Sequence, residues 1–227
     1  MAHHWPVFEG MLAAQAPALR ESLAEAWRIM DEGGTFMWLL ALTSFLAVAV
    51  IIFKFISLAR PRVVPAQLER RIEQLGDRNP GNDALTAISV AAREGRSTLA
   101  RLCAVALGHR QDPPDTLAEA VQTRAREEIL RLQVGIPMLE VVIAAAPMLG
   151  LLGTASGLVV IFGGLGETTD HVMIARGIGR ALNTTIAGLA ISLPSVIAHS
   201  YFSRRIERLA ARMEVLLGRL VGATARN

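Results

Sequence analysis

The sequence predicts an all-α, polytopic membrane protein with three transmembrane helices, and two observations lead to this prediction. The 227 residues have a positive mean hydropathy of +0.40, and 52% of them are apolar. Three stretches contain no Asp, Glu, Lys or Arg, namely 33–53, 141–166 and 181–203. Each stretch has at least the roughly 20 residues with which a helix crosses the hydrocarbon core. Three buried helices of a soluble protein are the weaker alternative, because soluble helices seldom run so far without charge.

The positions of the 23 basic residues predict the orientation of the chain. Twelve fall between Arg60 and Arg131, and six fall from Arg204 onward. The positive-inside rule therefore places both regions in the cytoplasm, and this asymmetry explains the pI near 9.9 without a nucleic-acid partner. The expected segments are an external amphipathic segment at 1–35, transmembrane helices at 36–58, 136–166 and 176–203, a cytoplasmic helical loop at 59–135, a short external hairpin at 167–175 and a cytoplasmic basic tail at 204–227.

The first expected element is a short amphipathic helix before the first span. Apolar residues recur there every three or four positions from Leu12 to Met30. Such a helix lies on the outer face of the bilayer or packs against the membrane helices. No cleavable signal peptide is evident, so we expect the first span to be retained. At its end, we expect Lys54 to extend its ammonium group toward the membrane surface.

The cytoplasmic loop is expected to form helices separated by helix-breaking residues. Proline or glycine interrupts the pattern between Pro61 and Pro65, at 77–81, at Gly95 and at 112–114. After the last break, Thr116 and Glu119 have the spacing of a capping box. No strong breaker follows before Pro137, so we expect one helix to continue from here into the second span, about 75 Å for roughly 50 residues.

Small and polar residues mark the contact between the second and third spans. Gly153 and Gly157 have the spacing that lets helix backbones approach closely. On the third span, a polar line with spacings of three and four residues shares one face: Thr185, Gly188, Ser192, Ser195 and His199. Thr154 of the second span is a candidate to face this line, and Pro194 frees a carbonyl group beside it. The line either joins helices through hydroxyl hydrogen bonds or forms a hydrated path for a small ion. We expect His199 to be a hydrogen-bonded residue at the interface.

The charge-free stretches contain no carboxylate that could exchange a proton within the membrane. If this chain conducts protons, another chain must therefore bring the acid. The sequence also contains no phosphate-binding glycine loop with its lysine, no HExxH and no GxSxG. We therefore expect no enzymatic activity, no catalytic residue, no cofactor and no metal. The single cysteine, Cys103, excludes an intrachain disulfide.

Two long motifs carry a family resemblance. They are APMLGLLGTASGLVVIF at 146–162 and GIGRALNTTIAGLAISLPSVIAHSYF at 177–202. In this order they resemble the second-span and third-span signatures of the MotA/TolQ/ExbB proton-channel family, closest to its ExbB and TolQ branch. The resemblance implies a ring-forming oligomer, commonly a pentamer, in a bacterial inner membrane, with long helices extending into the cytoplasm. The external segments at 1–35 and 167–175 would then be periplasmic.

The resemblance also implies partners and roles for residues. It implies an ExbD- or TolR-like single-span partner that carries a membrane aspartate, and a TonB- or TolA-like protein that delivers the work of proton flow to the outer membrane. Thr154 and Thr185 match the pore-facing threonines, and we add Ser192 to the expected proton pathway. The expected helix-packing residues are Gly150, Gly153, Gly157, Gly188 and Pro194.

The clearest departure from the family pattern is at Arg180, and His199 and Ser200 also stand where tyrosine and asparagine are frequent. Arg180 stands where the ExbB and TolQ branch usually has glutamate, with Arg176 one turn away. We expect these arginines to contact a partner or the mouth of the pore. Two other interpretations stay open: a membrane scaffold that conducts nothing, and, less favoured, a solute carrier, for which three spans without an internal repeat are a poor basis.

Overall fold

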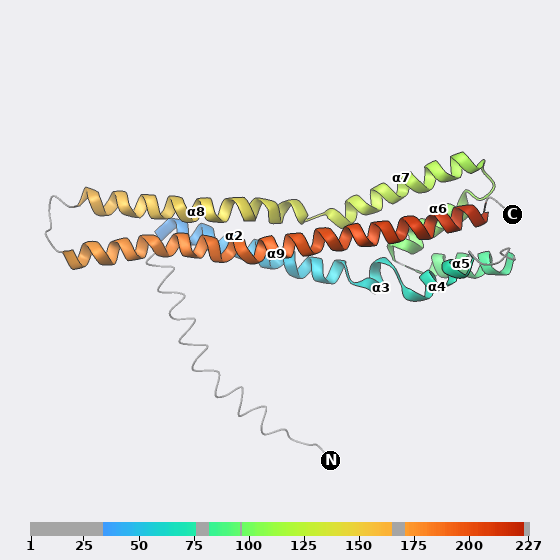
Figure 1. The fold of residues 1–227 in the computed structure, drawn as a ribbon, viewed down its shortest axis with the longest axis horizontal. Coiled ribbons are helices and arrows are strands. Elements are labelled where there is room, and N and C mark those ends of the chain that lie inside the picture. The colour runs from blue at the N-terminus through green and yellow to red at the C-terminus, as the bar shows by residue number, and fades with distance from the viewer. Residues whose placement is uncertain (1–33, 76–81, 96, 165–170, 225–227) are drawn as a thin grey trace, which may run out of the picture. The chain divides into compact units, whose positions relative to one another are not determined.

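The computed structural model describes residues 34–75, 82–95, 97–164 and 171–224, and all regular structure in these ranges is α-helical, as predicted. Figure 1 labels the helices: α2 (Gly34–Ser57), α3 (Arg60–Val63), α4 (Ala66–Gln74), α5 (Asn82–Glu94), α6 (Thr98–Gly108), α7 (Pro114–Gln133), α8 (Ile136–Gly163) and α9 (His171–Thr224). The amphipathic helix expected between Leu12 and Met30 lies outside the described residues, and so do residues 167–170 of the hairpin expected at 167–175. Residues 171–175 of that hairpin are instead the first residues of α9.

Three helical stretches are long and apolar enough to cross a membrane: Gly34–Ser57, Pro114–Gly163 and His171–Thr224. Their apolar side chains are largely exposed in the single chain, among them Phe45 on α2, Val160 on α8 and Leu193 on α9. Many exposed apolar side chains on helices of this length indicate contact with lipid or with other chains. The chain is therefore a multi-pass membrane protein, as the charge-free stretches predict.

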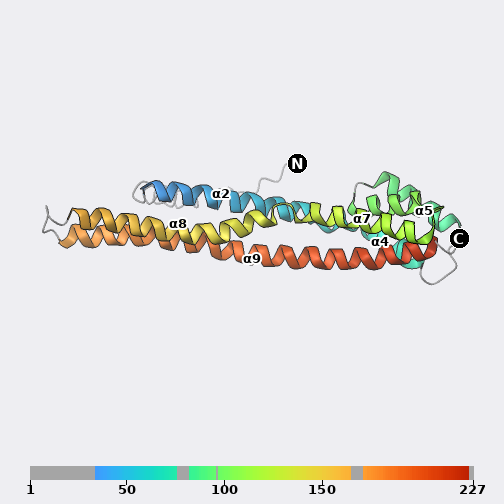
Figure 2. The same ribbon diagram turned by 90° about the horizontal axis from the view of Figure 1, so that it is seen from above.

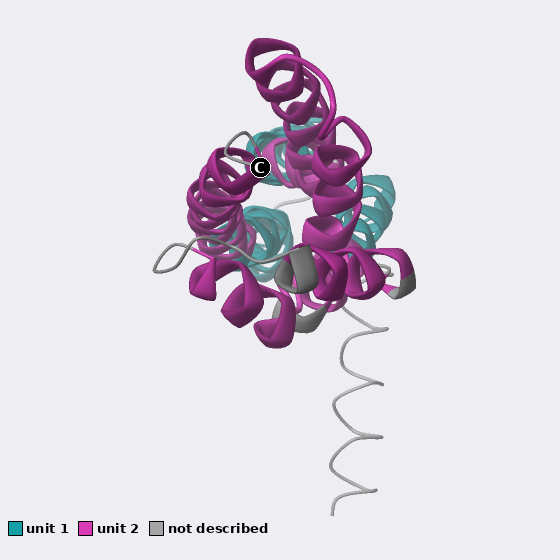
Figure 3. Ribbon diagram, turned by 90° about the vertical axis from the view of Figure 1, so that its right-hand side faces the viewer, with its two compact units in different colours: residues 1–46, 141–194 teal, residues 47–140, 195–227 magenta. Residues whose placement is uncertain are grey.

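The chain divides into two compact units, which Figure 3 colours separately. The described part of unit 1 contains the beginning of α2 up to Leu46, α8 from Val141 and α9 up to Pro194. Unit 2 comprises residues 47–140 and 195–227, and so contains the rest of these helices together with α3 to α7.

Unit 1 has a very small apolar core. Met37 and Leu40 of α2 and Ala146 of α8 are buried, and Leu149, Ala187 and Ile191 pack against them. Within this unit α8 and α9 lie side by side (Figures 1 and 2). Glycine brings their backbones together, because a Cβ atom added to Gly188 would lie 2.5 Å from the Ala146 carbonyl oxygen. Contact at this distance excludes any larger residue without movement of a helix.

Unit 2 has an extended apolar core built around the C-terminal part of α9. Ile72 of α4, Ile88 of α5, and Leu99 and Leu102 of α6 are fully buried in it. Most of the residues that α9 contributes are spaced alternately by three and four, and Leu217 is buried beside them: Phe202, Ile206, Leu209, Met213, Leu216, Leu220 and Ala223. This spacing is typical of helices that pack along their length. The region expected as a basic tail is therefore helical as far as Thr224.

The helix expected to continue from the cytoplasmic loop into the second span is interrupted for two residues. Val134 has an extended ψ of 127°, and Gly135 has a φ of +89°, a conformation that favours glycine. Gly135 is not evident as a helix end from the sequence, because a single glycine inside a helical pattern is often tolerated. The helix also begins earlier than the capping-box spacing of Thr116 and Glu119 predicts, at Pro114, which suits the first turn because its missing N–H is not needed there.

The prediction that Lys54 extends to the membrane surface is wrong. Lys54 is fully buried in unit 2, and its Nζ donates a hydrogen bond of 2.6 Å to the Leu132 carbonyl oxygen. The last carbonyl groups of α7 have no donor within their own helix, and the negative end of the helix dipole favours a cation there. The interruption at Gly135 thus creates the acceptor that holds Lys54 inside.

Candidate functional site

The candidate site lies in unit 1, where three glycines of α8 allow this helix to pack closely against α9. A Cβ atom at Gly150 would meet the Thr184 carbonyl oxygen at 2.7 Å, and one at Gly153 would meet Thr184 Oγ1 at 2.8 Å. A Cβ atom at Gly157 would lie 2.9 Å from that of Ala181. The close approach brings the side chains at the contact within hydrogen-bonding distance of the opposite backbone.

Three threonine hydroxyl groups meet at this contact. Thr154 Oγ1 of α8 lies 2.6 Å from Thr185 Oγ1 and 3.2 Å from Thr184 Oγ1, both on α9. Thr154 and Thr184 are buried, whereas Thr185 is partly exposed. The structure therefore brings together the two threonines that the sequence analysis selected, and it leaves Thr185 at the edge of the cluster.

Backbone carbonyl groups accept the protons of these hydroxyls. Each of the three threonines lies within 3.1 Å of the Gly150 carbonyl oxygen, and Thr154 and Thr184 also lie 2.8 Å from the Ala181 carbonyl oxygen. A hydroxyl group has one proton to donate and two lone pairs to accept with. Thr154 therefore donates to one of several acceptors at a time, and the cluster can exchange donors and acceptors without moving a helix.

Thr184 is the member of the cluster that the sequence analysis missed. It is 2% exposed and bonds to both helices. The polar line predicted from the sequence includes Thr185. Thr184 also fits its spacing, because it precedes Gly188 by four residues, and Gly188 precedes Ser192 by four residues. Two adjacent threonines cannot both be assigned to one face by spacing, so the packing against Gly150 was needed to identify Thr184.

The remaining residues of the polar line have separate partners. In unit 1, Ser192 Oγ donates 3.1 Å to the Ile143 carbonyl oxygen of α8. In unit 2, Ser195 is buried, and His199 Nε2 lies 3.1 Å from the Glu140 carboxylate, which is exposed. His199 is therefore hydrogen-bonded, as expected. Pro194 is exposed, unlike Gly150, Gly153 and Gly188, which are buried.

Arg176 and Arg180 are both exposed on α9 in unit 1. Arg180 lines a cavity of about 410 Å³ whose wall also contains Phe36 of α2 and Gly157 of α8. The two guanidinium groups lie one helical turn apart, so an anionic group beside α9 can reach both.

Unit 2 holds a second polar cluster, which the sequence analysis did not select. The fully buried Glu128 carboxylate of α7 receives a bidentate contact from Arg101 of α6, with Nε to Oε1 at 3.0 Å. Arg124 and Arg131 also contact Glu128, at 3.1 and 3.4 Å. The hydrogen bond from Arg101 holds the pKa of Glu128 below its usual value.

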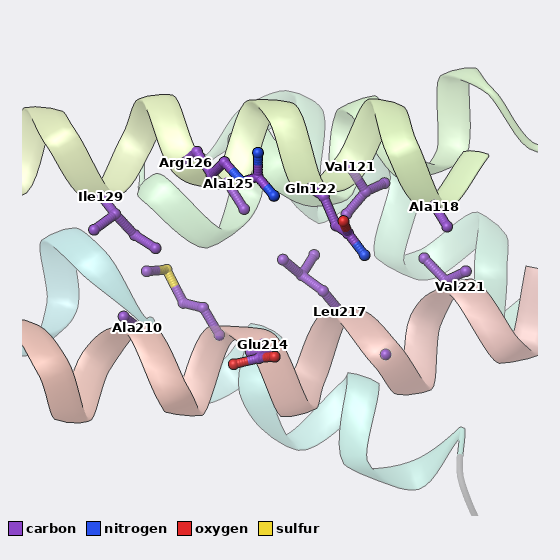
Figure 4. A pocket seen from close by; sticks show the side chains of 12 residues that line it. Ala118, Val121, Gln122, Ala125, Arg126, Ile129, Ala210, Glu214, Leu217 and Val221 are labelled. Atoms are coloured by element: carbon purple, nitrogen blue, oxygen red, sulfur yellow. The ribbon is translucent and has the colours of Figure 1, made fainter. Parts of the chain in front are cut away.

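A larger groove of about 580 Å³ separates α7 from α9 in unit 2. Figure 4 shows that its walls are mostly aliphatic, with Leu217 of α9 and Gln122 of α7 directed into the space between the helices. Within the described residues, no three His, Cys, Asp or Glu side chains are grouped so as to hold a metal ion. The groove therefore offers mainly an apolar packing surface.

The comparisons with known proteins connect these helices to one family. The model of the MotA/TolQ/ExbB proton channel family matches residues 89–215. The chain is 31% identical over 184 residues to the ExbB-like 1 protein of Synechocystis sp., across 75% of this chain and 69% of that protein. It is 28% identical to the biopolymer transport protein exbB1 of Vibrio cholerae, across 82% and 83%. It is 37% identical over 112 residues to the Tol-Pal system protein TolQ of Pseudomonas aeruginosa, across 45% and 48%. The family match includes every residue of the threonine cluster.

Proposed function

This chain belongs to the MotA/TolQ/ExbB proton channel family, on its ExbB and TolQ branch, and from that membership we propose that it is the pore-lining subunit of a proton-driven motor. The motor couples proton flow across a bacterial inner membrane to work on the cell envelope or to outer-membrane transport. The observation that supports this proposal most directly is the hydroxyl cluster between α8 and α9, in which Thr185 is partly exposed and Thr154 lies 2.6 Å behind it.

In the proposed mechanism, Thr185 faces the proton path and Thr154 orients its hydroxyl group. Backbone carbonyl oxygens of both helices lie within hydrogen-bonding distance of the Thr154 hydroxyl group. The close glycine contact between α8 and α9 therefore fixes the position of this hydroxyl group. The charge-free stretches contain no carboxylate. As the family resemblance implies, we propose that the proton carrier is an aspartate on an ExbD- or TolR-like partner helix, and that its carboxyl group exchanges hydrogen bonds with Thr185 during each passage.

The proposed assembly is a homo-oligomeric ring, with a pentamer as the expected size. The exposed apolar faces of α2, α8 and α9 support contacts with lipid and with neighbouring subunits. We propose the topology derived from the basic residues, with the N-terminus in the periplasm and the C-terminus in the cytoplasm. Arg176 and Arg180 then lie at the outer mouth of the pore, where they contact an acidic group of the partner. A TonB- or TolA-like protein receives the work.

A second candidate function is a scaffold that holds an envelope complex together and conducts nothing. One observation favours it: Thr154, Thr184, Thr185 and Ser192 all reach backbone carbonyl oxygens within the same chain. Hydroxyl groups with this arrangement join helices without taking part in transport. The two functions differ in whether proton flux depends on the Thr185 hydroxyl group.

Substitution of Thr185 by valine separates the two functions. Thr185→Val keeps the shape of the side chain and removes the hydroxyl group, whereas Thr185→Ser keeps the hydroxyl group. We expect Thr185→Val to lower proton flux about tenfold or more, since loss of the hydroxyl group that contacts the buried Thr154 costs about 1–3 kcal/mol. The measurement is dye-detected proton uptake by liposomes that contain the complex purified from its own membrane.

Thr43→Val is the matched control, because the Thr43 hydroxyl bonds to the Leu40 carbonyl oxygen of its own helix, at 2.8 Å. Native mass spectrometry of each variant reports whether the complex and its partner chains are retained. Unchanged flux in an intact Thr185→Val complex would exclude the Thr185 hydroxyl group from the proton path. No proton flux through the intact unmodified complex would exclude the conducting role and leave the scaffold.

A further inference from the structure

A basic pocket of about 300 Å³ lies in unit 2 where the C-terminal end of α2 meets α3, α6 and α7. Arginines from three different helices line it: Arg62 of α3, Arg101 of α6 and Arg131 of α7. The Glu128 carboxylate is the acidic group in the lining. Three guanidinium groups and one carboxylate leave the pocket with a net charge of +2.

Glu128 organises this pocket rather than neutralising it. Arg101 is fixed by its bidentate contact with the carboxylate, whereas Arg131 reaches it only at 3.4 Å with one nitrogen. Arg62 is exposed, and within the described parts of the chain it forms no ion pair. Arg62 and Arg131 therefore keep donor groups that can turn toward a ligand. Guanidinium groups bind phosphate with paired hydrogen bonds.

The other wall of the pocket is apolar. Phe53 and Ile56 line it from α2, and their side chains are 54% and 53% exposed. They belong to a helix that is apolar enough to cross a membrane. A ligand that satisfies both walls has an anionic group for the arginines and a hydrocarbon part that covers these two side chains. The volume is at the lower end of the range for small-molecule sites, so it suits a headgroup rather than a whole lipid.

We propose that this pocket binds the phosphate group of an anionic phospholipid from the surrounding membrane. The proposal rests on the proposed topology, in which α2 spans the membrane and ends at its cytoplasmic face, and it does not depend on proton conduction. Basic pockets at this depth recognise anionic headgroups, which are concentrated in cytoplasmic leaflets. A soluble phosphate compound shares the anionic chemistry but leaves Phe53 and Ile56 exposed.

The test measures phosphatidylglycerol binding to the full-length complex after its own lipids have been removed in a mild nonionic detergent. Native mass spectrometry counts the lipid bound at each added concentration. The variant is Arg62→Gln/Arg131→Gln, which leaves the contact between Arg101 and Glu128 intact. Arg219→Gln is the matched control, because Arg219 is exposed on α9 and does not line the pocket. Phosphatidylcholine serves as the lipid without net charge, and glycerol 3-phosphate serves as the soluble phosphate competitor.

We expect the affinity of one class of sites for phosphatidylglycerol to fall about fivefold for each lost guanidinium group and roughly 30-fold for both. Arg219→Gln should bind as the unmodified protein does, phosphatidylcholine should bind less tightly, and millimolar glycerol 3-phosphate should not displace the lipid. Equal phosphatidylglycerol binding by the double variant and the control would overturn the proposal. Displacement of the lipid by glycerol 3-phosphate would identify a soluble phosphate compound as the ligand and overturn the lipid assignment. Retained oligomer mass in the same spectra shows that each variant is folded.

Discussion

Units 1 and 2 are held together by different chemistry. In unit 1, glycines and threonines join α8 and α9, and backbone carbonyl groups accept most of the polar contacts. In unit 2, a large aliphatic core is surrounded by ion pairs, such as those of Arg212 with Glu69 and Glu73. Apolar burial drives association in water, but lipid chains are as apolar as leucine and give no such drive. Unit 1 thus has contacts that are typical of helices in lipid, whereas the core of unit 2 is typical of helices that pack in water, in agreement with the proposed topology.

The largest effect that we expect concerns Cys103, and it tests whether the core of unit 2 is closed. Burial raises the pKa of its thiol to about 12 from an ordinary value of 9.0. Because only the thiolate is nucleophilic, we expect alkylation by iodoacetamide at pH 8 to be about a thousandfold slower in the folded protein than after denaturation. Mass spectrometry follows the reaction directly, since the chain has one cysteine. Labelling at similar rates in both states would mean that this core opens readily, unlike a closed soluble core.

The second prediction concerns the glycine contact of unit 1. Alanine normally stabilises a helix relative to glycine by about 1 kcal/mol, and at Gly179, with nothing within 4 Å of a Cβ atom, we expect a gain of this kind. At Gly188 the new atom meets the Ala146 carbonyl oxygen, so Gly188→Ala should destabilise the protein by about 1–2 kcal/mol in spite of that gain. Unfolding by sodium dodecyl sulfate, followed by circular dichroism, measures both variants. Effects of the same sign at both positions would refute the close contact between α8 and α9.

The smallest expected effect concerns the pH dependence of unit 2. Because Arg101 lowers the pKa of Glu128, the ionised carboxylate stabilises the folded state above its unfolded value of 4.5, and this contribution is lost as the pH falls through the lower folded value. We expect Glu128→Gln to lower the free energy of unfolding by about 1 kcal/mol at pH 7, since its arginine partners are partly exposed. The difference should shrink progressively as the pH falls below 4.5.

Glu127→Gln is the control for this measurement, because Glu127 is exposed and pairs with Arg124 at the surface. Denaturant titrations at pH 7, 5 and 3 give the three free energies for each variant. A difference between Glu128→Gln and the unmodified protein that stays constant with pH would show that the carboxylate charge is not what stabilises this cluster.

The sequence by itself determined the helices that cross the membrane and the residues that meet between them. Charge-free stretches of sufficient length have one stable structure in lipid, because every backbone group must be bonded within its helix. The spacing of Gly153 and Gly157 and the pairing of Thr154 with Thr185 followed from helical periodicity and from the family motifs. These features depend on residue types and on their spacing along a helix, and both can be read from the sequence.

Only the tertiary structure decided the distant partners of Lys54, Thr184 and Glu128. Lys54 is buried because the interruption at Gly135 leaves a carbonyl group of Leu132 without a donor, 78 residues away. Thr184 belongs to the hydroxyl cluster because Gly150 lets its carbonyl oxygen come within reach. Glu128 is buried because Arg101 of another helix pairs with it. The stability of a polar group depends on what lies within about 3 Å of it, and helical spacing carries no information on those contacts.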